Sequence, residues 1–84
     1  MNRKEIYEKI YAMHVIMRSL NDEDLICRWL EDGIPDGTLS VEEVEDLYSL
    51  QTDKELDEEY SNLAVLFGEI VEKAVEDGYR GWLC

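Results

Sequence analysis

Residues 52–77, TDKELDEEYSNLAVLFGEIVEKAVED, are the stretch that decides the fold. Apolar residues recur in it at three- and four-residue steps from Leu56 onward, which is the pattern of one face of a helix. Thr52 and Glu55 have the spacing of a capping box, in which each residue satisfies a backbone N–H of the other at the start of a helix. The stretch therefore predicts one long amphipathic helix over about residues 53–77.

Three shorter patterns of the same kind precede it. They predict helices over about residues 2–18, 22–32 and 41–50, and no segment has the alternation of a strand. We therefore expect an all-α fold, a compact four-helix bundle in a single domain over residues 1–84, with the first and last helices as the central pair. Gly68 lies inside the last helix, where glycine costs about 1 kcal/mol relative to alanine. It either marks a close crossing with the first helix, which we favour, or is simply a tolerated strain.

Helix boundaries are marked by capping residues. Asn21 is the expected N-cap of the second helix, and Gly33 ends that helix. Ser40 and Glu43 have the spacing of another capping box, and Leu39 is placed to form a hydrophobic staple over the third helix. In that helix the residues expected to face the core are Val41, Val44, Leu47 and Tyr48.

The two cysteines and the C-terminal tail complete the expected packing. Cys27 lies in an apolar pattern and is expected in the core, whereas Cys84 is expected as an exposed thiol. Trp82 and Leu83 are expected to fold back onto the bundle. Two cysteines make no disulfide framework, no apolar run approaches a membrane span, and the N-terminus does not read as a secretory signal, so we expect a cytoplasmic protein.

The negative charge is concentrated in one part of the chain. Residues 22–59 hold fifteen of the 21 acidic residues but only Arg28 and Lys54 as bases, and thus all thirteen net negative charges. A field of this kind repels nucleic acid and anionic membranes and attracts basic protein surfaces. We therefore predict a protein partner with a basic surface, no direct nucleic-acid binding and no membrane binding.

Carboxylates three and four residues apart on a helix lie on one face, roughly 5–6 Å from each other. Rows of this kind have a spacing similar to that of phosphates, and a rigid acidic face can occupy a groove that holds DNA. The residues predicted to contact the partner are Glu42, Glu45, Asp46, Asp53, Asp57 and Glu58. The alternative is that the acidic surface serves only solubility.

A second alternative comes from residues 32–43, which resemble the second half of an EF-hand loop. Asp32, Asp36 and Glu43 fall on positions 1, 5 and 12 of such a loop, where carboxylates bind calcium. However, Ile34 replaces the ligand at position 3, and the stiff Pro35 follows it. The same residues are also explained by a helix stop, a turn and a capping box, and we expect no metal and no cofactor.

The sequence gives little indication of catalysis. His14 is the only histidine, and we interpret it as a half-buried, hydrogen-bonded residue rather than a base, because no nucleophile is placed beside it. No Cys/His spacing typical of zinc and no glycine-rich phosphate loop occurs. We therefore predict that the protein is not an enzyme.

Four short segments together resemble a family. They are Arg18-Ser-Leu-Asn-Asp-Glu-Asp, Arg28-Trp-Leu, Gly33-Ile-Pro-Asp-Gly and Gly81-Trp-Leu, and they are similar to small acidic uncharacterised proteins of phages and mobile elements of Gram-positive bacteria. That resemblance implies the host bacterial cytoplasm but no established activity. By size and charge alone, the chain is also similar to acidic anti-CRISPR and anti-restriction proteins, several of which imitate DNA.

These observations lead to one functional hypothesis and two alternatives. We expect a phage or mobile-element inhibitor of the anti-CRISPR or anti-restriction type. It would present one acidic face, formed by residues 22–59, that mimics DNA and docks on a basic, nucleic-acid-binding host defence nuclease. The alternatives are an EF-hand-like calcium module and a homodimeric assembly protein that associates through the last helix and its tail.

Overall fold

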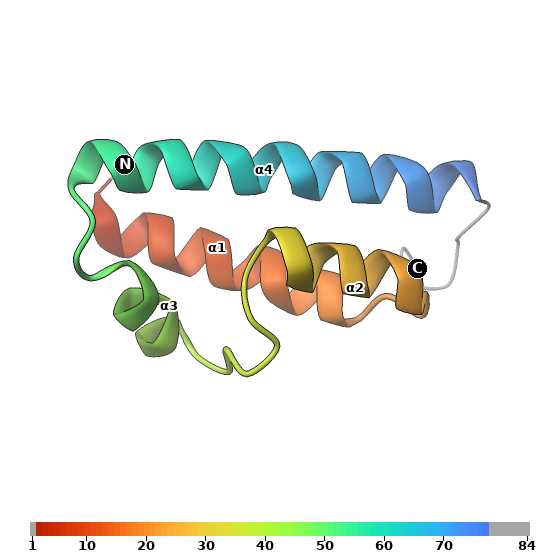
Figure 1. The fold of residues 1–84 in the computed structure, drawn as a ribbon, viewed down its shortest axis with the longest axis horizontal. Coiled ribbons are helices and arrows are strands. Elements are labelled where there is room, and N and C mark those ends of the chain that lie inside the picture. The colour runs from red at the N-terminus through yellow and green to blue at the C-terminus, as the bar shows by residue number, and fades with distance from the viewer. Residues whose placement is uncertain (1, 78–84) are drawn as a thin grey trace.

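The structure is a computed structural model that describes residues 2–77, and within this range the chain forms four helices and no strand. They are α1 (Arg3–Arg18), α2 (Glu23–Asp32), α3 (Val41–Tyr48) and α4 (Asp53–Glu76) (Figure 1). The all-α prediction is confirmed, and each predicted helix end lies within two residues of the observed one. The expected packing of Trp82 and Leu83 and the state of Cys84 lie outside the described residues.

The two long helices, α1 and α4, lie side by side and run in the same direction (Figure 1). This parallel arrangement follows from the connection between them. Helix α2 runs back along the pair, and the loop over residues 33–40 together with α3 returns the chain to the beginning of α1. As a result, the N-termini of α1 and α4 and the whole of α3 gather at one end of a molecule 39 Å long.

The core lies where α1, α2 and α4 meet, and Trp29 of α2 is at its centre. Its indole is fully buried and meets the ring of Phe67 on α4 edge-on, with 6.4 Å between the ring centroids. Around it, each helix contributes the apolar stripe that its three- and four-residue spacing predicts. The buried apolar residues are Ile6, Tyr7, Ile10, Met17, Leu20, Leu25, Trp29, Ile34, Val44, Tyr48, Leu56, Leu63, Ile70 and Ala74.

Capping follows the predicted pattern at the start of α4 and at Gly33, which is the C-cap of α2, and departs from it at the starts of α2 and α3. Thr52 and Glu55 form the full capping box. Asp22, not Asn21, is the N-cap of α2, because its carboxylate accepts the backbone N–H groups of the first turn. At α3, the Glu43 carboxylate reaches past the N-cap to accept from the N–H of Leu39 at 2.8 Å, so that box is only half formed.

Several residues expected inside lie at the surface. Cys27 is exposed, because Leu25 and Trp29 set the buried face of α2 and Cys27 points the other way. Leu47 is 44% exposed and Leu39 is 67% exposed. Leu39 therefore does not form the predicted hydrophobic staple over α3. Gly68 is also exposed, and a Cβ atom there would meet nothing within 4 Å, so the predicted close helix crossing is wrong.

Within residues 2–77, none of the helices is both long enough and apolar enough to span a membrane.

Candidate functional site

The six carboxylates predicted to contact a partner lie at one end of the molecule. Glu42, Glu45 and Asp46 lie on α3, the other three lie on the first two turns of α4, and all six are exposed. Both segments adjoin the first turn of α1 (Figure 1). The fold therefore brings together two groups that are separated in sequence by the connection between α3 and α4.

The basic first turn of α1 lies between the two groups. On one side, a surface pocket of about 380 Å³ is lined by Arg3 and Lys4 together with Glu42 and Glu45. On the other side, a pocket of about 510 Å³ is lined by Arg3 together with residues that include Asp53 and Asp57. The predicted acidic surface is therefore two acidic walls on either side of a basic ridge, not one unbroken row.

Asp53 is bound by that ridge. Its Oδ1 accepts a hydrogen bond from the Arg3 guanidinium at 2.8 Å, and this contact is the main cause that raises the pKa of Arg3. Arg3 also donates to the Tyr48 carbonyl at 3.1 Å and to the Tyr7 hydroxyl at 3.0 Å, which fixes the guanidinium against α3. Asp53 thus helps to hold three helix ends together, and it is the one of the six predicted contacts that makes an ion pair within residues 2–77.

Most other acids of the stretch over residues 22–59 make no ion pair within residues 2–77. Only Asp36 and Asp53 do so, with Arg18 and Arg3, and thus thirteen of the fifteen carboxylates are without an ion-pair partner in that range. Arg28, the one basic residue of α2, pairs instead with Glu69 of α4 at 2.6 Å. The negative field that the sequence predicts therefore persists in the folded protein.

The acidic stretch over residues 22–59 does not form a single face, however. Helix α2 begins at the end of the molecule opposite to α3 (Figure 1), and it places Glu23 and Asp24 there. In its first turn these two carboxylates also interact favourably with the helix dipole. The predicted single acidic face over residues 22–59 is therefore wrong, because α2 runs antiparallel to α1 and α4 and its first turn lies at the end of the molecule opposite to α3.

The structure does not assemble the predicted calcium ligands. Asp36 bonds to Arg18 at 2.6 Å, and Glu43 accepts from the Leu39 N–H, so these two carboxylates are turned to separate partners. Within residues 2–77, no group of three or more histidine, cysteine, aspartate and glutamate side chains is placed to hold a metal ion. The turn at Pro35, closed by a hydrogen bond from the Thr38 N–H to its carbonyl, explains the loop without a metal.

One polar pair in the core was not predicted. His14 is buried, not half-buried, with 1% of its surface exposed, and its Nδ1 accepts a hydrogen bond from the Trp29 indole N–H at 2.9 Å. This bond requires a lone pair on Nδ1, so the neutral ring carries its proton on Nε2. Neither nitrogen then has a free lone pair with which to act as a base or bind a metal.

Burial lowers the pKa of His14, and the charge of Arg18 lowers it further, while Asp36 and the Thr38 carbonyl act in the opposite direction. The fold therefore favours the neutral ring that Trp29 requires. A sign of this pair is present in the sequence, since His14 continues the buried stripe of Ile10 and Met17 at helical spacing. Its partner, however, is fifteen residues away on another helix and is chosen only by packing.

The comparisons with known proteins return no match, whether against family models, curated proteins or solved structures.

Proposed function

We propose that the protein is a non-enzymatic binding module that docks its acidic end on the basic surface of another protein. The observation that carries the proposal is the gathering of Glu42, Glu45 and Asp46 with Asp57 and Glu58 at one end of the molecule. None of the five makes an ion pair within residues 2–77. Carboxylates that are held on helices and are not engaged in ion pairs form a field that complements lysine and arginine.

Within this class, we propose the groove of a nucleic-acid-binding protein as the docking surface. Such grooves are lined with lysine and arginine that contact phosphates at regular spacing. The acidic end offers carboxylates on two sides of the first turn of α1, and a duplex likewise presents phosphates on two strands. The resemblance to small acidic phage proteins favours a host defence nuclease as the partner.

The experiment is a displacement assay on purified restriction nucleases and RNA-guided nucleases, each bound to a fluorescent DNA duplex. Displacement of the duplex by the wild-type protein, read as anisotropy, is expected to weaken steeply between about 50 and about 200 mM salt. The variant Glu45→Lys/Asp46→Lys is expected to displace DNA at least about tenfold more weakly, which corresponds to about 1.4 kcal/mol.

The matched control is Glu72→Lys/Glu76→Lys, at two exposed positions near the other end of α4. It changes the net charge by the same amount, so a general field effect predicts equal losses for both variants. Binding through the acidic end predicts that only the first variant loses activity. Equal losses, or no displacement by the wild type from any nuclease tested, would leave solubility as the role of the charge.

A further inference from the structure

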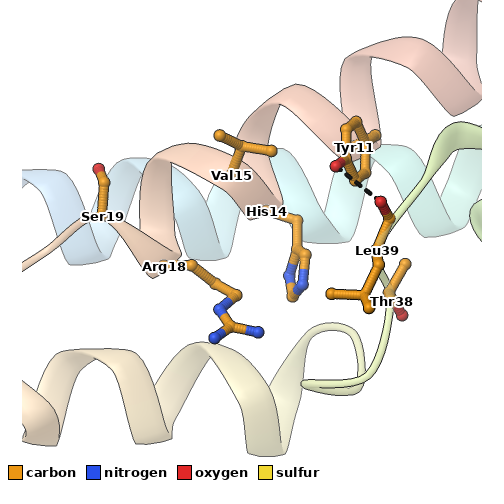
Figure 2. A pocket seen from close by; sticks show the side chains of 7 residues that line it. All are labelled: Tyr11, His14, Val15, Arg18, Ser19, Thr38 and Leu39. Atoms are coloured by element: carbon orange, nitrogen blue, oxygen red, sulfur yellow. Dashed lines mark hydrogen bonds between the residues drawn. The ribbon is translucent and has the colours of Figure 1, made fainter.

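Polar side chains along one side of α1 bind the connection between α2 and α4. Arg3, Tyr11 and Arg18 are eight and seven residues apart, about two turns of helix in each case, and they therefore lie on the same side. The Tyr11 hydroxyl donates to the Leu39 carbonyl at 3.0 Å (Figure 2), and Arg18 donates to the Asp36 carbonyl at 2.9 Å. These two bonds fix the loop before α3, whereas Arg3 lies at the acidic end.

Arg3 uses each nitrogen of its guanidinium on a different acceptor. Its Nε donates to the Tyr7 hydroxyl at 3.0 Å. One terminal nitrogen donates to the Asp53 carboxylate at 2.8 Å, and the other donates to the Tyr48 carbonyl at 3.1 Å. Asp53 is the first residue of α4, and Tyr48 is the last residue of α3. Because a guanidinium is planar and donates in fixed directions, these bonds set the end of α3 relative to the start of α4.

Helix α3 has little else to fix its orientation. Within residues 2–77, the bond from Arg3 to the Tyr48 carbonyl is the one side-chain hydrogen bond that joins α3 to another helix. The buried residues of α3 are Val44 and Tyr48, and apolar contact of this kind is not directional. The direction in which the carboxylates of α3 point therefore depends on Arg3.

The ion pair between Arg3 and Asp53 contributes little to stability. The Arg3 side chain is 32% exposed and that of Asp53 is 85% exposed. Pairs as exposed as this one are weakened by solvent and by salt. The loss of Arg3 is therefore expected to change the geometry of the acidic end more than the stability of the fold.

We propose that Arg3 is the positioning residue of the acidic end, which holds the carboxylates of α3 and those of α4 in the relative arrangement that a basic partner surface recognises. The effect on binding rests on the proposed function. Removing the cation makes the acidic end more negative, so charge alone predicts tighter binding to a basic surface. Positioning predicts weaker binding, because carboxylates that Arg3 no longer holds in place must be ordered on docking.

The first measurement uses the free protein and needs no partner. Amide hydrogen exchange is compared between the wild type and Arg3→Met, which keeps an unbranched side chain and removes all three bonds. Exchange is expected to be at least about tenfold faster in residues 45–48 of α3 and to stay within about twofold in residues 63–70 of α4. An equal increase in both helices, which indicates an effect on overall stability, or no increase in α3 would overturn the proposal.

The second measurement is the displacement of DNA from a nuclease. Arg3→Met is expected to displace DNA at least about threefold more weakly, and its affinity should depend less steeply on salt, because fewer ion contacts form at once. Lys4→Met is the matched control, since Lys4 is exposed beside Arg3 and makes no ion pair or hydrogen bond within residues 2–77. It removes the same charge and should displace DNA more strongly, as charge alone predicts.

A variant of constant charge completes the test. Tyr7→Phe removes one acceptor of Arg3 and keeps the ring, and it should weaken displacement in the same direction as Arg3→Met. Displacement by Arg3→Met that equals or exceeds that of the wild type overturns the positioning role, and so does weaker displacement with an unchanged salt dependence, which indicates loss of folded protein. If the wild type displaces DNA from no nuclease, the proposed function fails instead, and hydrogen exchange by itself decides whether Arg3 positions α3.

Discussion

Lowering the pH from about 7 to about 5.5 should weaken the fold through His14, the only histidine. The folded state buries the ring with its lone pair turned to the Trp29 N–H at 2.9 Å. Protonation would set two donors against each other and bury a cation close to Arg18. The unfolded state has no such restriction and takes up a proton near the ordinary value of about 6.5.

The direction of the change in stability follows from the coupling between folding and the protonation of His14. Because the pKa of His14 is lowered on folding, mainly by burial, the stabilisation is complete above the unfolded pKa and is lost as the pH falls below it. One proton contributes at most about 1.4 kcal/mol per pH unit, so the free energy of unfolding should fall by at most about 1.3 kcal/mol between about pH 7 and about pH 5.5.

Urea unfolding followed by tryptophan fluorescence, at constant ionic strength, measures this loss. His14→Asn is the control, since it keeps an acceptor for Trp29 and does not titrate, and it should show a flat profile over the same range. A wild-type loss that the variant reproduces in full would refute the role of His14. Independently, the ring resonances of the wild-type protein should titrate with a midpoint below about 6.5, and a higher midpoint would equally refute it.

Two further predictions concern the helices. Gly68→Ala should raise the free energy of unfolding by up to about 1 kcal/mol, because Gly68 is exposed in α4 and a Cβ atom there meets nothing. Gly33→Ala should lower the free energy of unfolding, since a Cβ atom there would lie 2.5 Å from the Trp29 carbonyl oxygen. If urea unfolding finds the Gly33 variant more stable than the Gly68 variant, this reasoning is contradicted. Thr52→Ala removes the cap of α4 and should destabilise the protein by about 1 kcal/mol, whereas Thr52→Ser should restore most of the loss; equal losses would argue against capping.

Local patterns predicted the helices well because capping and amphipathic spacing act within a few residues. The start of α4 was predicted correctly, since Thr52 and Glu55 are only three residues apart and satisfy each other without help from the rest of the fold. The predicted N-cap of α2 was wrong because two neighbouring residues can each cap that helix. Both Asn21 and Asp22 are good caps, and only the backbone of the folded chain decides between them.

The burial of single residues was predicted less well. Cys27 and Leu47 are apolar, but which side of a short helix faces the core depends on its neighbours. Helices α2 and α3, with ten and eight residues, each have only two to three turns. Gly68 has no contact to explain it, because it lies on the exposed face of α4. Spacing alone does not distinguish a close crossing from an exposed glycine.

By itself the sequence determined the all-α class, the helix bounds, the excess of negative charge and the carboxylates that lie exposed, because these depend on composition and on contacts within one or two turns. Only the tertiary structure decided where the charges meet. It placed the acids of the first turn of α2 at the far end, placed Arg3 between α3 and α4, and paired His14 with Trp29. Such contacts join residues far apart in the chain, and they are fixed by how the helices pack around a shared core, which no local pattern records.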